Sequence, residues 1–230
     1  LTTQGVVLDT PPIVIGGTYA IGHSVATNGT DYFVAWAREG TSSPPTIDIY
    51  GTRVSASGAV QDLNGIPICT RQGTQDMPTT AYGGGTYYLT WQDKSTSNTK
   101  LYGARVSPQT GAVSPPDGHP ISQASASIKA SRSLAFTGGH FLAVWEQAKA
   151  IVGRRIQPSG TFSDATHFTI YQSPANKWLP SVVSGTGVFH VSWTEGPSGS
   201  ELSKTLRVTP AASLVDTAPI TFALTGKVYY

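Results

Sequence analysis

Short stretches in which apolar and polar residues alternate run along the whole chain, and clusters of Gly, Asn, Ser and Pro separate them. Alternation with a period of two, enriched in β-branched and aromatic residues, is typical of strands that bury one face. No segment carries the helical period over a useful length. The chain is therefore predicted to be all-β.

The strand-like stretches recur as a larger unit. In each unit one stretch begins with an aromatic residue and ends in Trp, and the steps between successive Trp residues are 55, 54 and 48 residues. A stretch of small residues precedes it, an Arg-bearing stretch follows it, and a fourth stretch, with Pro-Ile in three of its copies, comes last. The Trp stretches are residues 32–36, 87–91, 141–145 and 189–193. The Arg stretches are residues 50–54, 102–106, 152–156 and 205–208.

Repeats of this length built from four strands are typical of a β-propeller, whose blades pack around a common axis. We predict one propeller domain, residues 1–230, with four four-stranded antiparallel blades of about 50 residues each. The repeat units are residues 17–70, 71–123, 124–172 and 173–225. Only small side chains fit where blades converge, so the stretch before each Trp is predicted to be the inner strand. The Trp, Arg and Pro-Ile strands follow outward in that order.

Residues 1–16 do not fit into the four units. Residues 12–16 match an outer strand that arrives before any inner strand. Three arrangements are open: the segment closes the ring beside the last outer strand, it belongs to a longer propeller, or it pairs with the edge of a neighbouring subunit. A fifth blade built from both ends of the chain is a further alternative.

The motifs Tyr-x-Val-x-Trp, Tyr-Gly-x-Arg-Val and Gly-Val-Val-Leu-Asp-Thr-Pro-Pro-Ile resemble the β-propeller repeats common in large exported bacterial proteins. The resemblance covers nearly the whole chain. It implies a propeller fold and an extracellular setting, and it brings no catalytic residues with it. The chain lacks the Gly-His and Trp-Asp pair of WD40 repeats, sialidase Asp boxes and calcium loops of the Asp-x-Asp-x-Asp-Gly form.

Composition excludes several classes of protein. Charged residues make up 12% of the chain and hydrophobic residues 39%, a balance that argues against disorder. The net charge is +2 and the basic residues are scattered, so nucleic acid is not an expected partner. No apolar run reaches the length of a membrane-spanning helix. The single Cys69 excludes an intrachain disulfide, the spacing of the His residues indicates no metal site, and no cofactor is expected.

Residues that recur in every unit are expected to have a structural role. The four Trp residues are either sugar-stacking platforms or core; each shares a strand face with two large apolar residues, so we expect them in the core. An acid follows each Trp and an Arg lies on the next strand, so we expect one structural Arg–carboxylate pair per blade. The acids are Glu39, Asp93, Glu146 and Glu195, and the Arg residues are Arg53, Arg105, Arg155 and Arg207. His190 stands in an apolar position, and we expect it to be a hydrogen-bonded core residue.

Specificity is expected where one unit departs from the others. Four such residues stand at or just before the start of an inner strand: His23, Asp76, Arg132 and Trp178. Strand ends nearest the axis line one mouth of the channel. These residues are therefore predicted to form a ligand-binding pocket for an anionic or sugar-like molecule, the alternative being that they are solvated loop residues.

The leading hypothesis from sequence is a secreted or cell-surface, non-enzymatic propeller that binds a carbohydrate, as a lectin does, or another protein. One alternative is a structural subunit of an extracellular complex that self-associates through its spare terminal strand. A second alternative is a glycoside-cleaving enzyme, which requires two carboxylates roughly 5 to 9.5 Å apart. Only Asp76 stands near the predicted channel mouth, so the sequence favours binding over catalysis.

Overall fold

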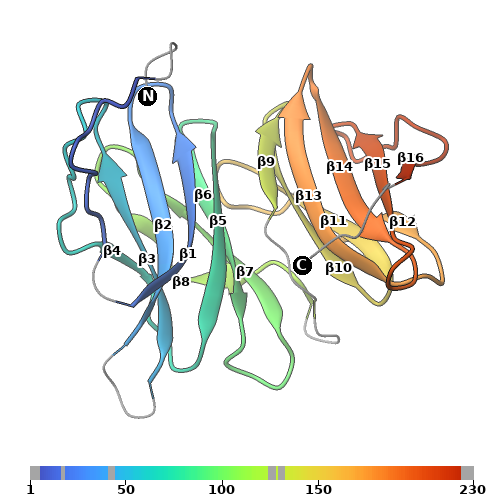
Figure 1. Ribbon diagram of the computed structural model, residues 1–230, viewed down its shortest axis with the longest axis horizontal. Helices are drawn as coiled ribbons and strands as arrows, with labels where there is room; N and C mark the ends of the chain where they lie inside the picture. The colour runs from blue at the N-terminus through green and yellow to red at the C-terminus, as the bar shows by residue number, and fades with distance from the viewer. Residues whose placement is uncertain (1–5, 17–18, 41–44, 124–127, 129–132, 224–230) are drawn as a thin grey trace.

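A computed structural model describes residues 6–16, 19–40, 45–123, 128 and 133–223 of the chain. These residues form sixteen strands and no helix. The strands make four antiparallel sheets of four strands each, and the sheets are the blades of a β-propeller (Figure 1). The predicted fold class is confirmed.

The blades follow one another along the chain. Blade 1 contains β1 (Ala20–Thr27), β2 (Tyr32–Glu39), β3 (Ile47–Val54) and β4 (Ile66–Cys69). Blade 2 contains β5 (Gln75–Gly83), β6 (Thr86–Asp93), β7 (Lys100–Val106) and β8 (Val113–Pro120). Blade 3 contains β9 (Leu134–Thr137), β10 (His140–Gln147), β11 (Ala150–Ile156) and β12 (Phe168–Gln172). Blade 4 contains β13 (Lys177–Gly185), β14 (Val188–Glu195), β15 (Leu202–Val208) and β16 (Ile220–Ala223).

Within each blade the strands lie side by side in the order of the sequence. The first strands of successive blades also pack against one another, β1 against β5, β5 against β9 and β9 against β13. The stretch before each Trp is therefore the inner strand, as predicted. Glycines with positive φ close the hairpin between β5 and β6, at Gly84 (φ 57°) and Gly85 (φ 82°), because side chains rarely adopt that conformation.

The four Trp residues are buried, as predicted, and those of blades 2, 3 and 4 pack on the preceding blade. Trp91 of blade 2 belongs to one buried cluster with Phe33 and Ala35 of blade 1. Trp145 packs in the same way on blade 2, and Trp193 on blade 3. Burial of a large aromatic side chain removes much apolar surface from water, so these residues hold neighbouring blades together.

In blades 1 to 3, a glycine in the third strand leaves space for a large side chain of the second strand. A Cβ atom added to Gly51 would lie 2.3 Å from the ring of Phe33, and one added to Gly103 would lie 2.8 Å from the ring of Tyr88. In blades 1 to 3, this second-strand side chain lies over the glycine of the third strand and contacts the next blade. The three side chains are Phe33, Tyr88 and Leu142. Blade 4 has Thr205 at this position.

Blades 1 and 4 are the two ends of the series. In the described part of the chain, the extensive strand contacts between blades do not join blade 4 to blade 1. On blade 1, Val25 and Tyr32 are exposed, and on blade 4, Val183 and His190 are exposed. The expectation that His190 is a core residue is therefore wrong, because no further blade covers that face among the described residues.

The amino-terminal segment lies along blade 1 (Figure 1). Residues 6–16 form no strand. A Cβ atom on Gly58 would meet Ile13 at 2.8 Å, and one on Gly16 would meet Trp36 at 3.2 Å, so the segment contacts blade 1 and not β16. Two of the arrangements considered, ring closure beside the last outer strand and a fifth blade from both chain ends, are absent from the described residues. Pro11 and Pro12 have no N–H to donate to a ladder, which disfavours pairing here.

Candidate functional site

One end of the blades carries several carboxylates. Inner strands begin there and second strands end there, and every blade repeats the same strand order, so these ends lie on the same side of the propeller. We call this group the acidic edge; its members are Glu39, Asp48, Asp76, Asp93, Glu146 and Glu195. The members differ in what holds them.

Asp76 lies at the start of inner strand β5. The strand register shifts between Asp76 and Thr79, and Met77 has φ 54°, so a bulge sets Asp76 apart from the regular ladder. Lys94 Nζ donates to Asp76 Oδ2 at 2.6 Å. The other oxygen, Oδ1, is buried and has no hydrogen-bond partner among the described residues. Buried polar atoms are normally paired, so this oxygen is open to a donor from water or a ligand.

Asp93, at the end of β6, is fully engaged. It is buried, with an Arg71 Nη2 to Oδ2 distance of 2.5 Å. Its other oxygen, Oδ1, accepts hydrogen bonds from the backbone N–H and the hydroxyl of Ser95. Both carboxylate oxygens of Asp93 are therefore bound by protein donors, and Asp93 stabilises the loop that follows β6.

Blade 4 contains a buried cluster of charged groups. Lys177 is fully buried, and its Nζ donates to the carbonyl oxygens of Ser173 and Ala175. Burial lowers the pKa of Lys177, an effect that nearby Glu195 partly opposes. Burial alone would raise the pKa of Glu195, but hydrogen bonds chiefly from Trp193, Ser173 and Lys204 outweigh it and lower the pKa. The cluster is internally satisfied and therefore structural.

Glu146 of blade 3 supports a turn. Its Oε1 accepts a hydrogen bond from the backbone N–H of Lys149 at 2.9 Å, and both Ala148 and Lys149 have positive φ. The neighbouring Gln147 accepts from the indole N–H of Trp145 at 2.9 Å. Asp76 is thus distinguished by its position at an inner strand, since Oδ1 of Asp48, at the start of β3, is also buried without a hydrogen-bond partner among the described residues.

The predicted pocket residues lie at separate places. His23 is exposed on β1, Asp76 is paired with Lys94, and Trp178 stands opposite Thr194 in blade 4. No hydrogen bond or ion pair joins these three side chains in the described part of the chain. Arg132 lies outside the described residues. A pocket shared by all four stays a prediction.

The predicted pairing of each Arg with the acid that follows Trp is wrong. Strand register places Arg53 opposite Phe33 and Glu39 opposite Ile47, so the two groups stand at opposite ends of the blade. Three of the Arg residues instead bind an Asp nine residues later in the chain; the pairs are Arg53–Asp62, Arg155–Asp164 and Arg207–Asp216. The spacing was visible in the sequence and could have identified them.

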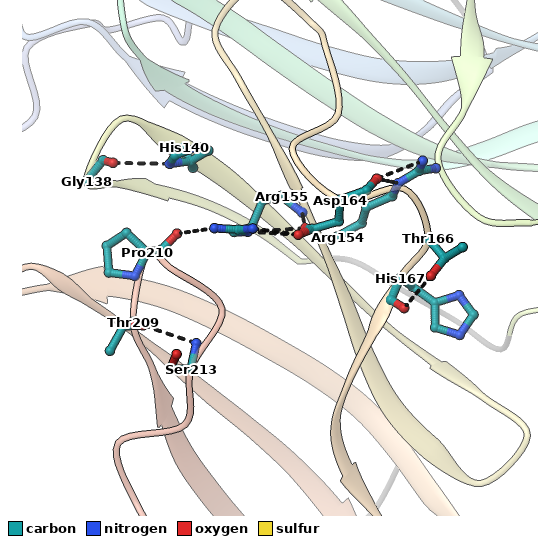
Figure 2. A network of polar contacts seen from close by, with 10 residues as sticks. All are labelled: Gly138, His140, Arg154, Arg155, Asp164, Thr166, His167, Thr209, Pro210 and Ser213. Carbon is teal, nitrogen blue, oxygen red and sulfur yellow. Dashed lines mark hydrogen bonds and ion pairs between the residues drawn. The ribbon is translucent and has the colours of Figure 1, made fainter.

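Figure 2 shows one of these pairs in full. Two nitrogens of the Arg155 guanidinium donate to Asp164, with Nη2 to Oδ1 at 2.6 Å, and the Arg155 backbone N–H donates to Oδ2 of the same carboxylate. Nη1 donates to the carbonyl oxygen of Pro210 in blade 4 at 2.9 Å. Each pair therefore ties together a blade, its own loop and, where there is one, the next blade.

Two further observations concern other classes of site. Among the described residues, no group of three or more His, Cys, Asp or Glu side chains is placed to hold a metal ion. The described residues also contain no helix of the length and apolarity needed to cross a membrane.

No protein-family model and no curated protein matches the sequence. Solved structures resemble it in fold. A subtype N10 neuraminidase-like protein of an A/little yellow-shouldered bat/Guatemala isolate has a TM-score of 0.57 at 12% identity, over 85% of this chain and 57% of that one. An endo-arabinanase of glycoside hydrolase family 43 from Bacillus licheniformis has a TM-score of 0.52 at 11% identity, over 90% of this chain and 81% of that one. An α-L-arabinofuranosidase from Lactobacillus brevis has a TM-score of 0.52 at 11% identity, over 86% and 72%.

These similarities overturn the leading hypothesis from sequence. A non-enzymatic, lectin-like module was expected, whereas the structures that resemble the chain are glycoside-cleaving enzymes and a neuraminidase-like protein. At identities of 12% and below, the similarity establishes the fold alone. Residues facing a propeller axis come from strands about 50 residues apart and form no contiguous motif, so a site built from them has no signature in the sequence.

Proposed function

We propose that this protein is a glycoside-cleaving propeller in which Asp76 is a reactive carboxylate. Two independent observations support the proposal. The chain resembles arabinan-, arabinoside- and mannoside-acting enzymes in fold. At the start of an inner strand, where a channel mouth is expected, Asp76 presents a buried oxygen that no described residue hydrogen-bonds.

The arrangement suits one half of the reaction. Glycosidases use one carboxyl group as a proton donor and a second, ionised carboxylate as base or nucleophile. Lys94 fixes Oδ2 of Asp76 at 2.6 Å and leaves Oδ1 for the substrate or the attacking water. A carboxylate oriented on one oxygen and unengaged on the other is suited to the role of base or nucleophile. The substrate class is a neutral or acidic glycan, and no cofactor enters this chemistry.

The proposal predicts that Asp76→Asn abolishes hydrolysis. Loss of a positioned base or nucleophile costs at least about 10²-fold in rate. Purified protein would be assayed on arabinan, β-mannan oligosaccharides and aryl glycosides, with reducing ends as the readout. Asp9→Asn, an exposed carboxylate outside the blades, is the matched control and should keep full activity.

Thermal unfolding of each variant separates a chemical effect from a folding defect. The Asp76→Asn variant is expected to melt near the wild-type temperature, since Lys94 retains an amide oxygen as its partner. Wild-type protein that cleaves none of these glycosides, or a folded Asp76→Asn variant as active as wild type, would refute the proposal.

A further inference from the structure

Blade 2 departs from the Arg–Asp pattern of the other blades. In the other three blades the residue opposite the Arg is followed directly by an Asp, whereas in blade 2 the residue opposite Arg105 is Ser114 and the next residue is Pro115; the three Asp residues are Asp62, Asp164 and Asp216. Strand register places Ser114 directly opposite Arg105. Neither side chain makes a hydrogen bond or an ion pair with any described residue. Arg105 is therefore a partly buried guanidinium that has lost the carboxylate its siblings bind.

The local cause is a turn with one additional residue. In blades 1, 3 and 4 the turn after the Arg strand is closed by a backbone hydrogen bond between residues four apart, for example Ser55 N–H to Ala59 O. In blade 2 the bond joins Ser107 N–H to Ala112 O, five apart. Strand β8 consequently starts at Val113 and pairs with β7 through Ser114. Because of the additional residue, Pro115 takes the position that carries the Asp in the other blades, and the guanidinium has no carboxylate there.

Arg105 also lacks the second partner of its siblings. Arg53 and Arg155 each donate from Nη1 to a carbonyl oxygen in the proline-containing turn of the next blade. The matching turn beside Arg105 contains Pro158, and no hydrogen bond reaches it from Arg105. Figure 2 shows the occupied version of the site, with Arg155 between Asp164 and Pro210.

A cavity lies where the missing partners would be. Its volume is about 490 Å³, within the usual range for small-molecule sites. Arg105 lines it together with Ser107, Gln109, Ser114, Pro158 and Ser159, and its lining contains no Asp or Glu. The only charged group in the lining is therefore the guanidinium, surrounded by hydroxyl and amide groups and by two proline rings.

We propose that this cavity binds the carboxylate of a small polyhydroxylated acid, of which a hexuronate is the model. The Arg105 guanidinium would bind the ligand carboxylate through two hydrogen bonds, in the bidentate geometry that Arg155 has with Asp164. Serine hydroxyls and the Gln109 amide would take the ligand hydroxyls, and the proline rings would cover its apolar face. Ligand binding at this cavity does not depend on the hydrolysis proposed for Asp76.

The test is binding of D-glucuronate to the intact protein, measured by isothermal titration calorimetry. Wild-type protein is expected to bind glucuronate and not glucose, which has the same ring without the carboxylate. Acetate and inorganic phosphate serve as further probes. Weaker binding of both than of glucuronate is expected, because neither carries the ring hydroxyls that the serine and Gln109 side chains would bind. Phosphate binding as tight as glucuronate binding would overturn the assignment to a carboxylate.

Two variants locate the site. Arg105→Gln should weaken glucuronate binding at least about tenfold, because it removes the charged fork. Ser114→Asp places a carboxylate in the cavity lining directly opposite Arg105, where it would pair with the guanidinium and repel an anionic ligand, and should abolish binding. Arg207→Gln, on the equivalent strand of blade 4, is the control and should bind as wild type does. Equal binding of glucose and glucuronate, no binding by wild type, or unchanged binding by Ser114→Asp would each overturn the proposal.

Discussion

Blades 2 and 4 have the same four strands and opposite surroundings. The strand β6 of blade 2 is buried along its whole length, and the ring of Tyr88 packs at a tilt against that of Phe141 of blade 3, with ring centres 5.3 Å apart. At the same position of blade 4, His190 is exposed, and Thr205 replaces the glycine that the side chain of Tyr88 leans across in blade 2. A blade therefore forms with or without a neighbour on this face. The side chains, and not the strand framework, distinguish an interface from a free surface.

The sequence marks the difference between a covered and a free blade face through two neighbouring positions, one in the second strand and one in the third. An aromatic or Leu residue in the second strand accompanies glycine in the third strand of blades 1 to 3, since the large side chain needs the space that a missing Cβ leaves. A polar residue accompanies Thr205 in blade 4. If the comparison is right, substitutions at matched positions should have large effects in blade 2 and small effects in blade 4.

The largest contrast is expected between Tyr88→Ala and His190→Ala. Tyr88 is fully buried, so its truncation should cost about 3–5 kcal/mol of the free energy of unfolding. His190 is exposed, and its truncation should change that free energy by less than about 0.5 kcal/mol. Urea denaturation followed by tryptophan fluorescence measures both.

Tyr88→Phe provides the control for the first variant. It keeps the ring and removes only the hydroxyl, which lies 2.9 Å from His119 Nε2, so about 1 kcal/mol should be lost. Similar costs for Tyr88→Ala and His190→Ala would mean that both faces are covered in solution, and the comparison would fail.

Much of the fold could be predicted from the sequence, because the repeat exposes it four times. The strand order, the inner strand and the buried Trp residues all follow from aligned stretches. His190 was misassigned because its aligned positions are buried in the other blades, and alignment says nothing of whether a neighbour is present. The course of residues 6–16 was misassigned for a similar reason: a strand-like pattern shows a capacity to pair and does not name the partner.

The candidate site was harder to predict than the fold. The Arg–carboxylate pairs were assigned to the wrong acids, since adjacency of two strands does not fix which ends meet until the register is known. Asp76 was identified because it breaks the repeat at an inner strand, although its unengaged oxygen is visible only in three dimensions. Arg105 was overlooked because its unusual feature is the absence of the carboxylate that the other Arg residues bind.

A smaller contrast is expected at the third-strand glycine. A Cβ atom on Gly103 would lie 2.8 Å from the backbone oxygen of Leu89, which cannot move aside as a side chain can. Gly103→Ala should therefore cost about 1–3 kcal/mol. Thr205→Ala at the matched position creates no clash and loses only the hydroxyl's hydrogen bond to Val191 O, about 1 kcal/mol. The same urea titration applies, and a Gly103→Ala variant as stable as wild type would show that the Tyr88 side chain can repack.

The smallest contrast concerns the Arg–Asp pairs of blades 3 and 4. Arg155 reaches the next blade through Pro210, whereas the exposed Arg207 bonds only within its own blade. Asp164→Asn should cost about 1–2 kcal/mol at pH 7, allowing for the partial exposure of the pair. Asp216→Asn should cost less. Thermal melts of the two variants, compared at equal ionic strength, measure the difference, and a larger loss for Asp216→Asn would contradict the role assigned to the contact with the next blade.

The stability cost of Asp164→Asn should depend on pH, because it comes from the charge of the Asp164 carboxylate paired with Arg155. Burial alone would raise the pKa of Asp164, but hydrogen bonds and charge from Arg155 outweigh it, so the pKa is lowered. A carboxylate with a lowered pKa stabilises the fold above its ordinary pKa, about 3.9, and loses that contribution as the pH falls through the lowered value. The stability difference between wild type and Asp164→Asn should therefore be complete at pH 7 and shrink below about pH 4. A difference that stays constant down to pH 2 would assign the loss to packing and not to the charge of Asp164.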